Sequence, residues 1–281
     1  MRVAALLALL SSLSWGVADF MGGLAARRAG SAQVLAVSYP SGAVLITFLA
    51  LFVIPGELST DLMGISVLTG IVGSIAIALL YAALVRGQMG VVSPITAVMS
   101  GAVPVVVGLL RGEEVTGFAF AGMGLAVLAV VLVSRESAAH HGRTPLSAIA
   151  LAVASGFAIG IYLTVLGSAP ENSGVWVASL GRWVSTVIMI TFVLVIVRSF
   201  DRKTFPWMIA ILAGVLDTTA NGLFQLASQR GLLSVVAVLG SLYPVATVVL
   251  ARVVIKERMN RVQGVGVFMA LSAAILLAIN S

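Results

Sequence analysis

Three charged residues lie inside long apolar stretches of the sequence: Asp19, Arg182 and Asp217. A charge within a lipid bilayer is costly unless it faces protein or water, so each of them is a candidate functional residue. Asp217 is followed by Asn221 and Gln225, a spacing that places three polar side chains on one face of a helix. Such a stripe either joins helices by hydrogen bonds or lines a water-filled cavity, and the carboxylate favours the cavity.

The chemistry of these groups suits a zwitterionic ligand. At about 1.5 Å per residue, Arg182 and Asp217 lie roughly 12 and 16 Å below the same membrane face and could share one cavity. Arg182 would bind the carboxylate of an amino acid and Asp217 its ammonium group, although the two side chains could equally neutralise each other. Asp19 lies nearer the opposite face, about 24 Å below the first, where it could gate the cavity or bind a coupling proton.

Aromatic residues could line the same cavity, with simple packing or anchoring at the membrane surface as the alternative. The candidates are Trp15, Tyr81, Tyr162, Trp183 and Tyr243. Proline inside a helix removes a backbone hydrogen bond and can supply a flexing point, although membrane helices also tolerate it routinely. Pro94, Pro104 and Pro244 are therefore candidate gating positions.

Composition indicates which elements carry these residues. Hydrophobic residues make up 60% of the 281 and charged residues 9%, with a mean hydropathy of +1.15. A helix that crosses a bilayer needs about 20 apolar residues, and ten such segments can be read, joined by short connections. The runs are continuous rather than alternating, which favours helices over barrel strands. We expect an all-α polytopic membrane protein with ten transmembrane helices, the ninth covering residues 232–251.

The sequence also repeats itself without a gap at an offset of 144 residues. Arg86-Gly87 matches Arg230-Gly231, Glu113 matches Glu257, and residues 46–48 match residues 190–192. We expect a first five-helix repeat over 1–137, a linker over 138–144 and a second repeat over 145–281. An odd number of spans in each copy inverts one relative to the other, and inverted repeats are typical of secondary transporters.

The repeat also separates scaffold from candidate site. The positions that correspond to Asp19, Arg182 and Asp217 are Leu163, Ser38 and Gly73, none of which is charged. A charge that only held the scaffold together would be expected in both copies. We therefore expect the charges that occur once to belong to a binding site.

Loop charge predicts the orientation. Among Lys and Arg, only Arg2, Arg111 and Arg230 lie in connections on the side of the amino terminus. Arg182 lies within a span, and all the others lie on the opposite side. Short-loop Lys and Arg face the cytoplasm, so we expect a multi-pass protein of the plasma (inner) membrane with both termini outside.

Several classes of protein are disfavoured. There is no phosphate-binding glycine loop, no cysteine, no metal-binding array around His140 and His141, and no membrane aspartyl protease motif around the aspartates. We expect no enzyme activity, cofactor or metal, and the topology signal explains the net charge of +6 without a nucleic-acid partner. Small residues in the fifth and tenth spans favour close helix packing within the bundle or in a homodimer.

These features together resemble the EamA-type family of the drug/metabolite transporter superfamily. The residues that carry the resemblance are Ser14-Trp15-Gly16, the two Arg-Gly pairs that open the fourth and ninth segments, and a Glu followed about nine residues later by Gly122 or Gly266. Within that superfamily the chain resembles the YddG-like amino-acid exporters. The resemblance covers the whole chain and implies a small-metabolite exporter that works by alternating access through a cavity between the repeats. Members are usually drawn with cytoplasmic termini, opposite to what loop charge predicts here.

The leading hypothesis is thus a secondary transporter that exports amino acids, with a small-molecule substrate and the lipid bilayer as its partners. A lipophilic-cation or drug exporter is the alternative within transport, and it would need Asp217 but not Arg182. A passive channel is the alternative of another class.

Overall fold

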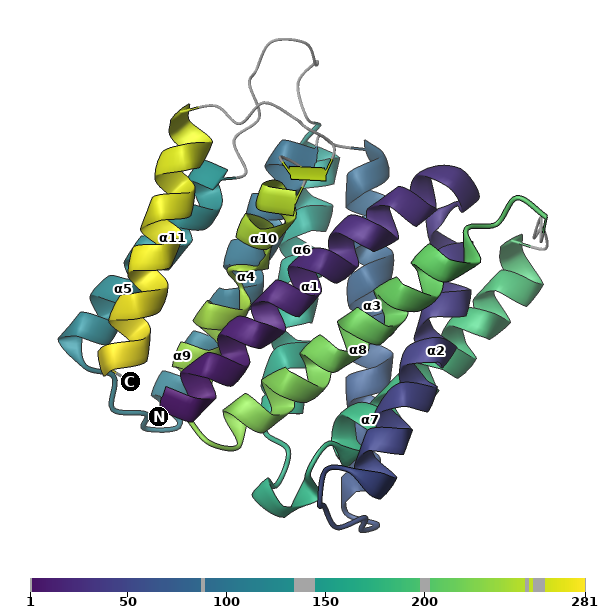
Figure 1. Ribbon diagram of the computed structural model, residues 1–281, viewed down its shortest axis with the longest axis horizontal. Helices are drawn as coiled ribbons and strands as arrows, with labels where there is room; N and C mark the ends of the chain where they lie inside the picture. Colours follow the sequence, from purple (N-terminus) through teal and green to yellow (C-terminus); the bar gives the residue numbers. More distant parts are fainter. Residues whose placement is uncertain are drawn as a thin grey trace.

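The computed structural model describes residues 2–86, 89–133, 145–197, 203–250, 253–254 and 261–280, and every regular element in them is helical (Figure 1). The first half contains α1 (Arg2–Ala29), α2 (Ser31–Phe52), α3 (Leu62–Arg86), α4 (Met89–Leu110) and α5 (Gly117–Val133). The second half contains α6 (Leu146–Gly167), the short 3-10 helix η1 (Glu171–Ser173), α7 (Trp176–Phe192) with a π-helical extension η2 (Val193–Val197), α8 (Trp207–Ser228), α9 (Leu233–Gly240), α10 (Tyr243–Leu250) and α11 (Arg261–Asn280).

The lengths of the helices fit a membrane. Seven helices in the described ranges are long and apolar enough to cross a bilayer, and three shorter apolar helices cover residues 95–110, 117–133 and 233–246. The last of these stretches, within the ninth expected span, contains a turn at residues 241–242: α9 ends at Gly240 and α10 begins at Tyr243. Pro244 follows the break directly, and its missing N–H cannot continue the hydrogen-bond ladder of α9. The expected count of ten spans stays a prediction.

The two halves pack as a pseudo-symmetric pair. Ser11 on α1 donates to the carbonyl of Ala220 on α8 at 2.8 Å, and Ser155 on α6 donates to the carbonyl of Ala76 on α3 at 2.9 Å. Each residue of the second bond lies 144 positions from its partner in the first, so the same contact is built twice. The internal repeat in the sequence is therefore also a repeat in the packing.

Glycines bring neighbouring helices into backbone contact at equivalent places. A Cβ atom on Gly214 of α8 would lie 2.0 Å from the carbonyl oxygen of Ser38 on α2. A Cβ atom on Gly70 of α3, the counterpart of Gly214, would lie 2.6 Å from the carbonyl oxygen of Gly181 on α7. These contacts bring α2 against α8 through backbone alone, and α7 against α3 through backbone and the side chain of Val184.

The helix pair α5 and α11 lies at one edge of the bundle (Figure 1). Gly122 of α5 packs against Leu277 of α11, and Gly266 of α11 packs against the backbone of Val133 on α5. These contacts are again related by the offset of 144. The small residues predicted to allow close approach thus do so within the chain, whereas the homodimer stays a prediction.

Both ends of the chain lie at one end of the bundle, which we call the terminal face: α1 begins there and α11 ends there (Figure 1). The connections α2–α3, α4–α5, α6–α7 and α8–α9 reach this face. The connection between the halves, residues 134–144, falls outside the described residues.

Candidate functional site

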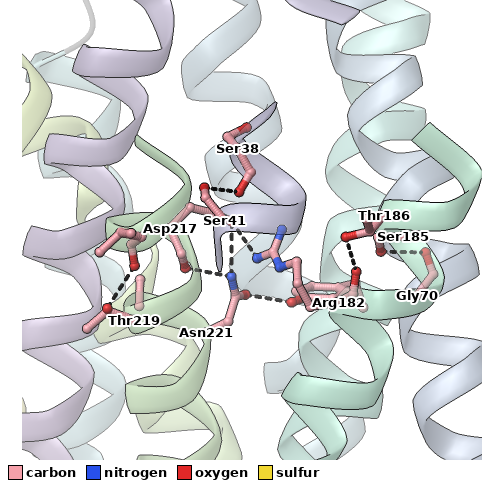
Figure 2. Close-up of polar contacts among 12 residues, drawn as sticks. Ser38, Ser41, Gly70, Arg182, Ser185, Thr186, Asp217, Thr219 and Asn221 are labelled. Carbon is pink, nitrogen blue, oxygen red and sulfur yellow. Dashed lines mark hydrogen bonds and ion pairs between the residues drawn. The ribbon is translucent and has the colours of Figure 1, made fainter. Parts of the chain in front are cut away.

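The candidate site centres on an ion pair between two helices of the second half. Arg182 of α7 and Asp217 of α8 form a hydrogen-bonded salt bridge, and Figure 2 shows Arg182 reaching across toward α8. The Arg182 side chain is 9% exposed and that of Asp217 32%. The two charges proposed from the sequence to share a cavity therefore do meet, and the carboxylate is the more accessible partner.

An amide and a phenol extend this pair. The Nδ2 group of Asn221 donates to the backbone carbonyl of Asp217 at 2.7 Å and lies 3.4 Å from its carboxylate (Figure 2). Asn221 Oδ1 in turn accepts a hydrogen bond from the hydroxyl of Tyr162 on α6 at 2.5 Å. The ring of Tyr162 lies over Gly73, where a Cβ atom would be 3.1 Å from the ring. The first-half counterpart of Asp217 thus provides room for an aromatic side chain of the second half.

Tyr39 of α2 completes the cluster, and it is the residue that sequence reasoning missed. The guanidinium carbon of Arg182 lies 4.8 Å from the centroid of the Tyr39 ring, a cation–π contact with a buried tyrosine. The repeat carried the signal, because α2 and α7 are equivalent helices that pack against each other. Ser38 is the counterpart of Arg182, so residues beside Ser38 are expected to face Arg182.

Asp19 of α1 lies near the ion pair. It is exposed, yet it lies close enough to Asp217 of α8 and Tyr243 of α10 for an electrostatic interaction with each. Since these neighbours belong to other helices, the open surface of Asp19 faces the space between helices. The structure thus brings Asp19, Arg182, Asp217, Asn221, Tyr162 and Tyr243 into one region.

Two predicted aromatic residues pack elsewhere. Trp15 of α1 packs against Phe224 of α8 in a tilted arrangement, with ring centroids 5.7 Å apart, and both rings lie against Gly240 of α9. Trp183 is 40% exposed, and its indole N–H donates to Thr47 of α2 at 2.9 Å. It points away from the ion pair because adjacent residues of a helix project about 100° apart. The side chain of Tyr81 lies outside the described residues.

Gln225 is fully buried and bonded to the backbone of the α6–α7 connection. Its Oε1 accepts from the N–H of Ala178 at 2.9 Å, and its Nε2 donates to the carbonyl of Gly174 at 2.9 Å. Gln229, the residue directly after the end of α8, also donates to the carbonyl of Gly174 at 3.0 Å. Gln225 therefore holds a loop at the terminal face and is separated from the ion pair by the layer that contains Asn221.

Other polar contacts tie the terminal face together. Glu57 of the α2–α3 connection accepts from the Asn172 side chain at 2.7 Å, and its N–H donates to the carbonyl of Asn172 at 2.8 Å. The Glu113 carboxylate accepts from the N–H groups of Leu233 and Ser234 at 2.8 and 3.1 Å, which satisfies two donors at the start of α9. Glu257, the counterpart of Glu113, falls outside the described residues.

Accessibility rises with distance from the terminal face. Gln225 and Asn221 are buried, the Asp217 side chain is one-third exposed, and Asp19 is exposed. The first three follow α8 away from the terminal face at intervals of one helical turn, and Asp19 lies beyond them on α1. The exposed members of the polar cluster therefore lie away from the terminal face.

The prolines behave differently from one another. Helix α4 runs without a break through both Pro94 and Pro104, and Pro104 is buried. The side chain of Pro94 is outside the described residues, and Pro244 is buried directly after the α9–α10 break. Of the three expected flexing points, only Pro244 adjoins an interruption of the helix, and gating at any of them stays a prediction.

Two further features lie apart from the polar cluster. A hollow of about 300 Å³ between α4, α5 and α9 has a largely apolar lining that includes Val105, Phe120 and Val238. It contains none of the predicted site residues, so we place the candidate site at the ion pair on chemical grounds. No group of three or more His, Cys, Asp or Glu suited to a metal ion occurs in the ranges that the structure describes; His140 and His141 lie outside them.

The architecture defines a class of protein: a multi-pass helical membrane protein made of two homologous halves with a polar cluster between them. The chain belongs to the EamA-like transporter family, whose pattern matches residues 2–135 and again residues 146–279. It is thus a multi-pass membrane protein of a transporter family.

Solved structures show the same fold. Twenty-nine chains match. One of them, a crystal structure, superposes with a TM-score of 0.77 over 97% of this chain and 95% of its own, at 14% sequence identity. At that identity the likeness concerns the fold alone. No curated protein matches the sequence.

Proposed function

We propose that this protein is a secondary transporter that exports small zwitterionic metabolites, amino acids above all. The observation that carries this proposal is the Arg182–Asp217 ion pair, which has no charged counterpart in the first half. A zwitterion can replace such a pair group by group: its carboxylate takes the place of Asp217 on Arg182, and its ammonium binds the released Asp217. The charge within the membrane stays balanced at each stage, which avoids the cost of an isolated ion.

The surrounding groups suit this exchange. The Tyr39 ring packs against one face of the guanidinium, so Arg182 keeps this cation–π contact when its ion pair with Asp217 is broken. The Tyr162–Asn221 hydrogen bond fixes the amide beside the Asp217 carboxylate. We propose that Arg182, Asp217, Asn221 and Tyr162 contact the substrate, whereas Trp15 and Trp183 support the helices around it and Gln225 supports the terminal face.

The repeat supports alternating access. In the described conformation the exposed members of the polar cluster lie away from the terminal face, and the inverted arrangement of the halves would provide an equivalent conformation open toward that face. Loop charge indicates that the terminal face is outside the plasma membrane, so the described conformation would accept substrate from the cytoplasm, as export requires.

Counterflow of labelled amino acids into proteoliposomes tests the function. We expect saturable flux stimulated by unlabelled substrate on the other side, and loss of flux in both Arg182→Ala and Asp217→Asn. The matched control is Asp61→Asn, which removes a carboxylate from the exposed α2–α3 connection and should leave flux unchanged. Flux without saturation or trans-stimulation would indicate a channel instead. A variant lacking Arg182 that still carries lipophilic cations would indicate the drug-exporter alternative.

A further inference from the structure

The candidate site holds one more carboxylate than a zwitterion needs. Among the residues that the structure describes, Arg182 and Asp217 neutralise each other, whereas Asp19 forms no ion pair. Asp19 is accessible, faces the space between helices, and lies within electrostatic range of Asp217. A zwitterion that replaces the Arg182–Asp217 pair leaves this charge unmatched, and an unmatched charge at membrane depth is costly.

The position of Asp19 can be placed along the bundle from a contact between its helix and α8. Ser11 of α1 is level with Ala220 of α8, because they share a hydrogen bond. Asp217 precedes Ala220 by three residues and Asp19 follows Ser11 by eight, and the two helices run in opposite directions. At about 1.5 Å per residue, Asp19 therefore lies about 7.5 Å further from the terminal face than Asp217.

That separation is close to the reach of a four-carbon side chain with a terminal cation. A ligand whose carboxylate is on Arg182 and whose α-ammonium is on Asp217 would extend its side chain away from the terminal face. Asp19 is the carboxylate in that direction, on α1 beside Tyr243 of α10. A side-chain cation there would bring the site to neutrality.

We propose that the preferred substrates are amino acids with a cationic side chain, bound by Arg182 at the carboxylate, Asp217 at the α-ammonium and Asp19 at the side-chain cation. This inference rests on the proposed function and narrows its substrate class. Asp19 is then a specificity-determining residue for the side chain of the substrate.

Competition in the counterflow assay tests the inference, with lysine, ornithine and leucine as competitors against labelled lysine and labelled leucine. We expect wild-type protein to prefer lysine and ornithine to leucine by about tenfold or more, the value of one charge-assisted contact. Asp19→Asn should lose most of this preference while its leucine flux persists. Asp61→Asn removes the same charge away from the site and should keep the wild-type preference.

The outcomes separate this inference from the proposed function. Leucine transported as well as lysine by wild-type protein, or a preference unchanged in Asp19→Asn, would overturn the side-chain assignment and leave the zwitterion site intact. Loss of all flux in Asp19→Asn, with lysine and leucine equally affected, would also overturn it and would favour a coupling-proton site. Absence of flux with every amino acid in wild-type protein would instead overturn the proposed function.

Discussion

At the residue scale, the polar cluster is a series of side chains joined by a cation–π contact, an ion pair and hydrogen bonds. Tyr39 lies under Arg182, Arg182 pairs with Asp217, and Asn221 connects Asp217 to Tyr162. Four helices thus contribute to a chain of contacts in which every charged or amide group has a partner. Burial of a polar group is costly unless the group has a hydrogen-bond or ionic partner. Substrate binding therefore has to replace each partner that it removes from these side chains.

Substitution of Tyr162 by phenylalanine tests this dependence. The ring over Gly73 is kept, and only the hydroxyl that donates to Asn221 is lost. One such hydrogen bond contributes about 0.5–1.5 kcal/mol, so we expect the KM for amino-acid counterflow to rise about two- to tenfold. Thermal stability of the detergent-purified protein is the control and should change little. An unchanged KM would place Asn221 outside the binding contacts.

Part of this cluster could be predicted from the sequence. Arg182, Asp217 and Asn221 could be singled out because polar groups are costly at membrane depth and because the repeat lacks them in its first half. Gln225 was assigned to the same stripe, but its side chain binds backbone groups of Gly174 and Ala178. Tyr39 was not assigned, since an aromatic ring in a span fits packing and binding equally well. The role of each side chain depends on the residues that it contacts, and these residues belong to other segments of the chain.

At the element scale, close backbone contact at glycine sets the spacing of the helices that carry the site. Gly214 is one turn from Asp217 on α8 and lies directly against the backbone of Ser38 on α2. The same turn of α2 carries Tyr39. The distance between α2 and α8 therefore also fixes the position of Tyr39 relative to the ion pair.

We expect Gly214→Ala to destabilise the protein. The new methyl group would lie 2.0 Å from a carbonyl oxygen, and backbone cannot move aside as a flexible side chain can. Overpacking of this kind costs about 1–3 kcal/mol, which should lower the Tm of the purified protein by several degrees. Gly124→Ala on α5 is the matched control, because a Cβ there meets nothing within 4 Å. Equal Tm values for the two variants would contradict the packing argument.

Helix positions were readable from the sequence to a useful degree, but which of the candidate prolines adjoins an interruption was not. Apolar length predicts that a segment is helical and where it roughly ends. Apolar length does not predict where the hydrogen-bond pattern within a segment is interrupted. Proline does not predict it either, because Pro40, Pro94 and Pro104 lie in helices that continue through them. A proline leaves a backbone carbonyl of the preceding turn without its N–H donor. Whether the helix continues or breaks there depends on whether tertiary contacts supply another donor.

At the scale of the whole molecule, the two ends of the bundle differ although the halves repeat. Gln225 and Gln229 hold the α6–α7 connection, while their counterparts in the first half are Tyr81 and Val85. Glu57 and Asn172 bind each other at the terminal face, whereas the residues 144 positions away in the sequence are Asp201 and Arg28. Repetition supplies the scaffold, and departures from it distinguish one side of the membrane from the other.

Orientation can be measured directly because the chain contains no cysteine. Single substitutions Ser59→Cys at the terminal face and Lys203→Cys near the start of α8 place exposed thiols at opposite ends. We expect a membrane-impermeant maleimide to label the first in intact cells and the second only after permeabilisation, as loop charge predicts. The reverse pattern would put the termini in the cytoplasm, as the family resemblance suggests.

The central claim is that Arg182 and Asp217 bind the two charges of one zwitterion. The most direct test is the counterflow assay on wild-type protein with three competitors: an amino acid, its carboxamide, and the acid that lacks its amino group. The account predicts that the two half-analogues compete at least about tenfold more weakly than the amino acid, since each forfeits a charge-assisted contact. Half-analogues that compete as well as the amino acid itself would contradict it.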